Sequence, residues 1–245
     1  MASSICAALM TNARRNFSLS GPSIALDPRV NAIRPDLADV SLAALLFAPH
    51  YASPIERACI QVSTPMFDKP NGELSSEILG GERFWMLDQS GGWAWGWSGH
   101  DHYVGYVASA AIGPVEALIT TPANGDPVET AQQFLGMPYV WGGRGGAGID
   151  CSGLIQRALA ALGIAAPRDS DMQLAALGRD LSAGETLARG DIVVFPGHVG
   201  LMADPDTLIH ATRHHGKTVC EPLADVIARV GETHEIPVLA RRRII

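Results

Sequence analysis

The sequence has little cysteine and lacks metal-binding spacings. Its four cysteines lie far apart and include no C-x-x-C pair, which argues against a disulfide framework and a zinc knuckle. The eight histidines include no H-E-x-x-H pattern, so we expect no metal site. We interpret the cysteines as free thiols.

Basic runs and long apolar runs are also missing. Lys and Arg number 18 against 25 Asp and Glu, a formal charge of −7, and the longest basic run is Arg241–Arg243. Nucleic acid is therefore not an expected partner. No apolar run approaches the roughly 18 residues of a membrane span, so no membrane association is expected. Arg14 and Arg15 are followed by Gly21 and Pro22 rather than by the apolar stretch of an export signal, which favours a cytoplasmic protein over an exported one.

Four segments of different character divide the chain. Residues 1–50 form an arm in which apolar spacings of three and four predict one helix between residues 27 and 48. Residues 51–113 contain short β-type runs separated by turn residues, typical of a small β-barrel. Residues 114–127 have the proline and glycine content of a linker. Residues 128–245 show helical patterns followed by strand patterns, which predict an α+β domain.

One cysteine and two histidines have the spacing of a nucleophilic site. Cys151 opens a predicted helix, where the helix dipole and free N–H groups favour a thiolate. His198 and His210 lie on two predicted strands joined by a turn. If that hairpin is centred near residue 204, the two histidines are directly opposite, with Cβ atoms roughly 4.5 to 5.5 Å apart. His210 would then orient His198, the base for Cys151, and a slip of one residue would separate them.

Six short motifs resemble the NlpC/P60 cell-wall peptidases in order and spacing over roughly residues 125–243. They are Pro138–Gly143, Asp150–Leu154, Pro167–Ser170 with Gln173, Gly190–Phe195, Gly197–Gly200 and Leu208–Ala211. The resemblance implies a papain-like core in which Cys151, His198 and His210 form the triad. It also implies that Tyr139 and the backbone N–H of Cys151 stabilise the oxyanion.

The segment from about residue 54 to residue 113 resembles bacterial SH3 domains. The matching landmarks are Gly81–Arg83, Gly92–Trp95 and Tyr103–Val107. The subgroup that combines both domains and cleaves γ-D-glutamyl to diamino acid bonds in murein peptides holds the free amine of the N-terminal L-alanine between the domains. The resemblance assigns this binding to Asp150, Ser170, Glu82 and Tyr103, and further candidates for the substrate site are Ser152, Arg168, Asp169 and Trp141.

Structural roles remain open for several of these residues. Asp150 and Ser170 are also suited to capping helices, Glu82 to a solvated turn, and Tyr103 and Trp141 to packing.

The sequence thus predicts an α+β cysteine endopeptidase with a papain-like domain, an SH3-like barrel and an N-terminal helical arm. It would act without a cofactor on murein peptides in the recycling of wall fragments. One alternative is a broader amidase or acyltransferase on the same core. Another is a murein-binding module with an idle triad. The preferred diamino acid and the oligomeric state are not indicated.

Overall fold

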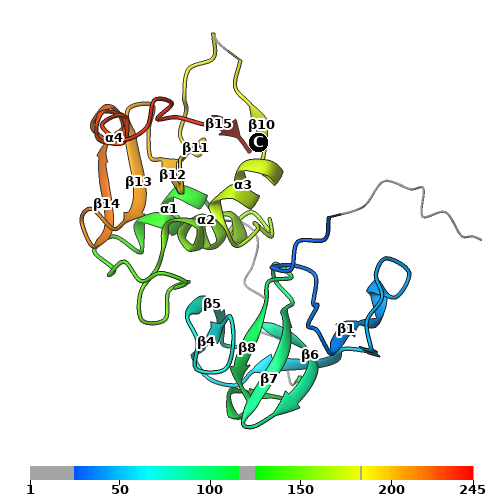
Figure 1. Ribbon diagram of the computed structural model, residues 1–245. Coiled ribbons are helices and arrows are strands. Elements are labelled where there is room, and N and C mark those ends of the chain that lie inside the picture. Colours follow the sequence, from blue (N-terminus) through cyan, green and yellow to red (C-terminus); the bar gives the residue numbers. More distant parts are fainter. Residues whose placement is uncertain (1–24, 116–124, 183, 245) are drawn as a thin grey trace, which may run out of the picture.

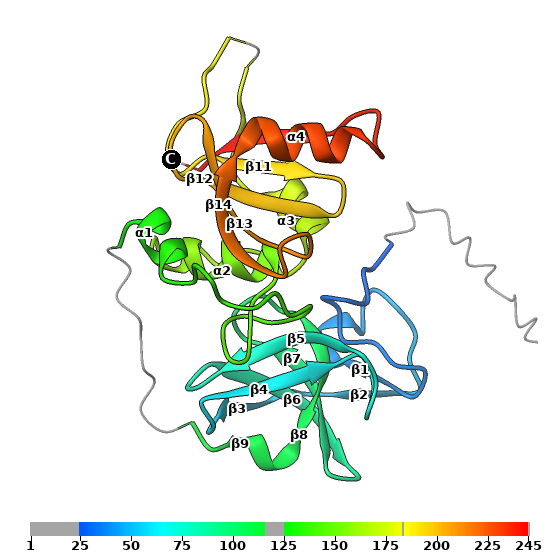
Figure 2. The same ribbon diagram turned by 90° about the vertical axis from the view of Figure 1, so that its left-hand side faces the viewer.

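The computed structural model describes residues 25–115, 125–182 and 184–244. An all-β domain lies against a mixed α+β domain, as Figures 1 and 2 show from two directions. The first half of the expected arm and most of the expected linker lie outside the described residues. No helix within the described ranges is long and apolar enough to cross a membrane.

The first domain is one antiparallel sheet in the order β5-β4-β8-β7-β6-β3-β9. Its strands are β3 (Ile55–Cys59), β4 (Ser63–Phe67), β5 (Leu74–Leu79), β6 (Arg83–Ser90), β7 (Trp93–Ser98), β8 (Val104–Ala108) and β9 (Ile112–Gly113). Alternate residues of these strands, among them Met66, Ile78 and Phe84, form a buried cluster. The period-two pattern therefore builds the core as expected.

The helix expected between residues 27 and 48 does not form, and this prediction was wrong. The chain there forms two short parallel strands, β1 (Leu37–Asp39) and β2 (His50–Ala52), with a 3-10 turn at Val40–Leu42. Asp39 is extended, and its carboxylate accepts a hydrogen bond from the N–H of Ser41. Phe47, one of the apolar residues whose spacing predicted the helix, is 91% exposed. Without a face to bury, apolar spacing does not stabilise a helix.

The second domain places helices on both faces of an antiparallel sheet. The sheet has the order β10-β15-β11-β12-β13-β14. Its strands are β10 (Arg179–Asp180), β11 (Ile192–Phe195), β12 (His198–Met202), β13 (Thr207–Thr212), β14 (Lys217–Pro222) and β15 (Ala240–Arg243); the helices are α1 (Pro127–Gln132), α2 (Cys151–Ala160), α3 (Ser170–Ala176) and α4 (Leu223–Gly231). A second 3-10 turn, Ser109–Ala111, lies in the first domain.

Alternation along β11 divides the core of this domain in two. Ile192 and Val194 join the buried cluster of α1 and α2, whereas Val193 and Phe195 join the cluster of α4. The sheet is therefore covered on both faces, and Cys151, the first residue of α2, lies at the backbone N–H of Val199 near the start of β12.

Candidate active site

Cys151 is the first residue of α2, and the chain around it is tightly fixed. The carboxylate of Asp150 caps the helix by accepting the N–H of Gly153 at 2.7 Å. A side chain at Gly153 would place a Cβ only 2.4 Å from the carbonyl oxygen of Gly143. The helix start is thus packed against the preceding loop, which explains why glycine follows the cysteine so closely.

The thiol of Cys151 is buried and protonated. Burial and the neighbouring Asp150 carboxylate raise its pKa to about 12, although the backbone N–H groups of Val199 and Ser152 at the sulfur oppose this shift. The stabilisation expected from the helix terminus is therefore outweighed by desolvation. A thiol in this state needs a base to become a nucleophile.

The two predicted histidines are in direct contact: His198 Nε2 lies 2.7 Å from His210 Nδ1. Leu201 faces Ile209 and Met202 faces Leu208, which centres the hairpin at residue 205 and corrects the expected 204. The resulting shift by two residues keeps both histidines on one face but makes them diagonal rather than directly opposite neighbours.

Both histidines are neutral at pH 7. Burial, with the nearby His210 and Arg229, lowers the pKa of His198 to about 3, and burial also lowers that of His210. The sulfur of Cys151 lies at the backbone N–H of Val199, next to His198 in the chain. Within the described residues, no hydrogen bond joins the thiol to either ring.

Behind His210 lies a carboxylate that the sequence reasoning missed. Glu221 Oε1 is 2.8 Å from His210 Nε2 and 2.5 Å from Arg229 Nη2. Burial alone would raise the pKa of Glu221, but hydrogen bonds from Arg229 and His210 lower it to about 2. The apolar spacing of Leu223, Val226 and Val230 indicates the helix α4, and from that helix Arg229 could have been located.

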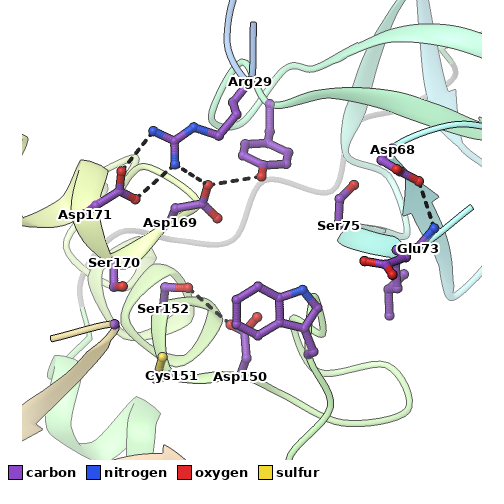
Figure 3. A pocket seen from close by; sticks show the side chains of 14 residues that line it. Arg29, Asp68, Glu73, Ser75, Asp150, Cys151, Ser152, Asp169, Ser170 and Asp171 are labelled. Carbon is purple, nitrogen blue, oxygen red and sulfur yellow. Dashed lines mark hydrogen bonds and ion pairs between the residues drawn. The ribbon is translucent and has the colours of Figure 1, made fainter. Parts of the chain in front are cut away.

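A cavity of about 340 Å³ opens beside Cys151 and is lined by both domains (Figure 3). Six of the residues proposed from the sequence to bind substrate line it: Tyr103, Trp141, Asp150, Ser152, Asp169 and Ser170. Trp141 is 55% exposed, so it forms part of the wall rather than of a core.

Asp150 lines this cavity but is already satisfied by protein groups. Arg168 contacts both of its oxygens, at 3.0 and 2.6 Å, and the N–H of Gly142 donates to Oδ2 at 2.8 Å. Arg168 is 1% exposed and does not line the cavity; it also donates to the Oγ atoms of Ser152 and Ser76. The capping alternative therefore describes what Asp150 does in this structure, and Arg168 anchors it.

Tyr103 and Asp169 meet across the domain boundary. The Tyr103 hydroxyl donates to Asp169 Oδ2 at 3.0 Å, and Arg29 Nη1 lies 2.9 Å from the same oxygen. Arg29 also pairs with Asp27 and Asp171. Burial raises the pKa of Asp169 despite these contacts. Figure 3 shows Arg29 reaching toward Asp169 and Asp171.

The expectation for Glu82 is corrected. Its two oxygens bind Arg144 at 2.6 and 3.0 Å, and it lines a different cavity. Asp68 and Glu73 instead present carboxylates from the first domain to the cavity of Cys151. Neither forms an ion pair with another described residue, and both are exposed. Asp68 accepts the N–H of Glu73 at 2.7 Å.

Tyr139 lies near the thiol, at the edge of the α2 core cluster. Burial and the adjacent Cys151 raise its pKa to about 12, so its hydroxyl remains a hydrogen-bond donor. The guanidinium of Arg213 lies 5.7 Å from the centre of the Tyr139 ring and 4.9 Å from that of Trp141. Among the described residues, no group of three or more His, Cys, Asp and Glu could hold a metal ion.

Comparison with known proteins gives two domain matches. Residues 136–229 match the model of the NlpC/P60 family, and residues 66–112 match that of the bacterial dipeptidyl-peptidase Sh3 domain.

Two curated relatives are both named gamma-D-glutamyl-L-lysine dipeptidyl-peptidase. The one from Bacillus cereus is 35% identical over 43% of this chain and 33% of its own length. The one from Bacillus subtilis is 29% identical over 72% of this chain and 53% of its own length. The chain thus spans from a third to about half the length of these relatives. A solved NlpC/P60 family protein from Bacillus cereus is 22% identical, with 77% of this chain and 63% of that chain covered and a TM-score of 0.43.

Proposed function

We propose that this chain, which carries an NlpC/P60 domain behind a bacterial SH3 domain, is a cysteine peptidase that hydrolyses the γ-D-glutamyl to diamino acid bond of murein peptides with a free N-terminal L-alanine. One observation carries the proposal: the thiol of Cys151 and the carboxylates of Asp68 and Glu73 line the same cavity. The two relatives named for γ-D-glutamyl-L-lysine cleavage support it. We further propose that the enzyme recycles wall fragments in the cytoplasm.

The proposed reaction is acyl transfer through a thioester. His198 accepts the proton of the Cys151 thiol as the sulfur attacks the γ-carbonyl carbon, and the imidazolium then gives that proton to the leaving amine. Water, deprotonated by His198, attacks the thioester and releases the γ-carboxylate and the thiol. The Tyr139 hydroxyl and the N–H of Cys151 are the proposed donors to the oxyanion.

The carboxylates of Asp68 and Glu73 are the proposed partners of the substrate ammonium. A charged amine that leaves water needs acceptors and an opposite charge. Asp150 contributes less, because Arg168 and backbone N–H groups already occupy its oxygens. Tyr103 and Ser170 supply additional polar atoms to the same cavity.

The size of the cavity favours release of a dipeptide. Its volume of about 340 Å³ lies near the lower end of the roughly 300 to 1,000 Å³ of small-molecule sites. The first domain supplies Asp68, Glu73 and Tyr103 to the cavity wall, so we expect little room for a longer extension before the γ-D-glutamyl residue. We therefore propose L-Ala-γ-D-Glu as the acyl part.

The decisive experiment compares murein tripeptides with free and acetylated N-termini, with products identified by mass spectrometry. The free peptide should yield L-Ala-γ-D-Glu, and acetylation should reduce kcat/KM at least 100-fold. Cys151→Ala should abolish cleavage, whereas Cys220→Ala, at an exposed cysteine on β14, should not. Equal cleavage of both peptides would instead favour the broader amidase, and full activity of Cys151→Ala would refute the mechanism.

A further inference from the structure

Four side chains from β12, β13, β14 and α4 form a continuous hydrogen-bonded chain behind the thiol. His198 Nε2 lies 2.7 Å from His210 Nδ1, and His210 Nε2 lies 2.8 Å from Glu221 Oε1. Arg229 closes the chain on the carboxylate, with Nη2 at 2.5 Å from Oε1 and Nη1 at 3.2 Å from Oε2.

We propose that Glu221 is a positioning residue: through His210 it fixes which nitrogen of His198 is free to accept the proton of the Cys151 thiol. The inference deepens the proposed function and rests on it for its kinetic consequences. Glu221 does not line the cavity of Cys151, so its effect on the reaction is transmitted through the two rings.

The assignment follows from counting protons. An ionised carboxylate can only accept hydrogen bonds, so His210 Nε2 must carry a proton to bond with Glu221. A neutral imidazole carries one proton, which leaves His210 Nδ1 as an acceptor. His198 Nε2 must then be the donor in the contact between the rings. The remaining nitrogen of His198, Nδ1, has a free lone pair.

Arg229 favours this placement of the protons over the reverse one. Its bidentate contact holds the carboxylate of Glu221 in one orientation, and His215 Nε2 lies 3.3 Å from Oε2. Glu221 is thus surrounded by donors and stays ionised, in agreement with its pKa of about 2. No other carboxylate of the described residues contacts His210, so nothing replaces Glu221 if it is removed.

Loss of this carboxylate would allow the opposite arrangement. If the proton of His210 moves to Nδ1, it faces His198 Nε2, and His198 must then carry its own proton on Nδ1. That form cannot accept the thiol proton. Glu221→Ala should therefore reduce kcat roughly 10- to 100-fold, as for carboxylates that orient histidines in metal sites, with KM unchanged.

Two variants and a matched control separate orientation from charge. In Glu221→Gln the amide oxygen can still accept from Arg229 and His210, so kcat should fall less than about fivefold. Glu185→Ala removes a glutamate that is also paired with arginines, Arg179 and Arg243, but lies outside the site, and it should keep the parental kcat. Nitrogen-15 NMR of the histidine rings should show His210 as the Nε2–H form in the parent and in Glu221→Gln, and a mixture of forms in Glu221→Ala.

The inference is overturned if His210 keeps the Nε2–H form in Glu221→Ala, or if that variant retains the parental kcat. It is also overturned if the glutamine variant loses as much activity as the alanine variant while its tautomer is unchanged, because charge alone would then explain the loss. The NMR measurement needs no substrate. If the parent cleaves no murein peptide, the proposed function fails, and the tautomers still decide the role of Glu221.

Discussion

Replacement of Arg168 by methionine tests whether Cys151, the proposed nucleophile, is held in place by a buried ion pair. Arg168 makes four hydrogen bonds, two to Asp150 and one each to Ser152 and Ser76. The side chains of Arg168 and Asp150 are 1% and 4% exposed. Methionine has a similar length but no charge, so the carboxylate would remain buried without a cation.

The expected cost is large because a charge left alone in the interior is not solvated. Breaking one side of a buried pair typically costs about 3 to 5 kcal/mol. For a protein of this size, each kcal/mol lowers Tm by roughly 2 to 4 °C, so Arg168→Met should lower Tm by about 6 to 20 °C. Activity should fall as well, since Asp150 caps the helix that begins at Cys151.

Thermal unfolding followed by circular dichroism measures this effect, with Arg189→Met as the control. Arg189 pairs with Asp126 at the surface, where the side chains are 43% and 37% exposed, and such a pair contributes at most about 1 kcal/mol. The double variant Asp150→Asn with Arg168→Met should recover part of the lost stability. Equal Tm values for Arg168→Met and Arg189→Met would refute the reasoning.

Four further predictions concern the chemistry of the site. Because burial raises the pKa of Cys151 to about 12, its alkylation by iodoacetamide should accelerate about tenfold per pH unit between pH 7 and 9, and a plateau at neutral pH would instead show a preformed ion pair. Because the pKa of His198 is about 3, this base stays neutral above that value, so the acid limb of kcat/KM should lie below pH 5 rather than near 6.5; a pH profile decides. Asp68→Asn with Glu73→Gln should raise KM at least tenfold for a peptide with a free amine and leave KM for an acetylated peptide unchanged. Tyr139→Phe should lower kcat roughly 100-fold and leave Tm unchanged.

The sequence could predict those parts of the site that depend on local pattern. His198 and His210 lie on neighbouring strands, β12 and β13, as predicted, and Cys151 is found at the first position of α2, at the start of the predicted helix. The helix expected in the arm is absent because spacing alone does not show whether a face is buried, and Phe47 remains in solvent. Glu221 was not predicted, because its partner Arg229 lies on α4, a helix that was not expected from the sequence.

The carboxylates of the first domain could not be predicted in the same way. Glu73 and Glu82 lie nine residues apart, each directly before a strand, β5 and β6, and no local pattern shows which of them will face Cys151. The choice depends on how the two domains dock. Arg144, almost fully buried, takes Glu82 as its partner, and this leaves Glu73 at the cavity.

The contacts between the domains also bear on what the SH3 domain does. Arg144 binds the backbone oxygen of Glu77 and the carboxylate of Glu82, and Gln156 donates to Asp101.

Arg168 extends this interface toward Cys151: it donates to Ser76 on β5 and holds Asp150, the cap of α2. Removal of the first domain would thus uncover or unpair the buried guanidinium groups of Arg144 and Arg168. Arg168 contacts Asp150, the residue before Cys151. Buried polar and charged groups that lose their partners when the surfaces separate destabilise the protein. The SH3 domain is therefore better understood as a structural wall of the proposed active site than as an independent module tethered to a catalytic domain.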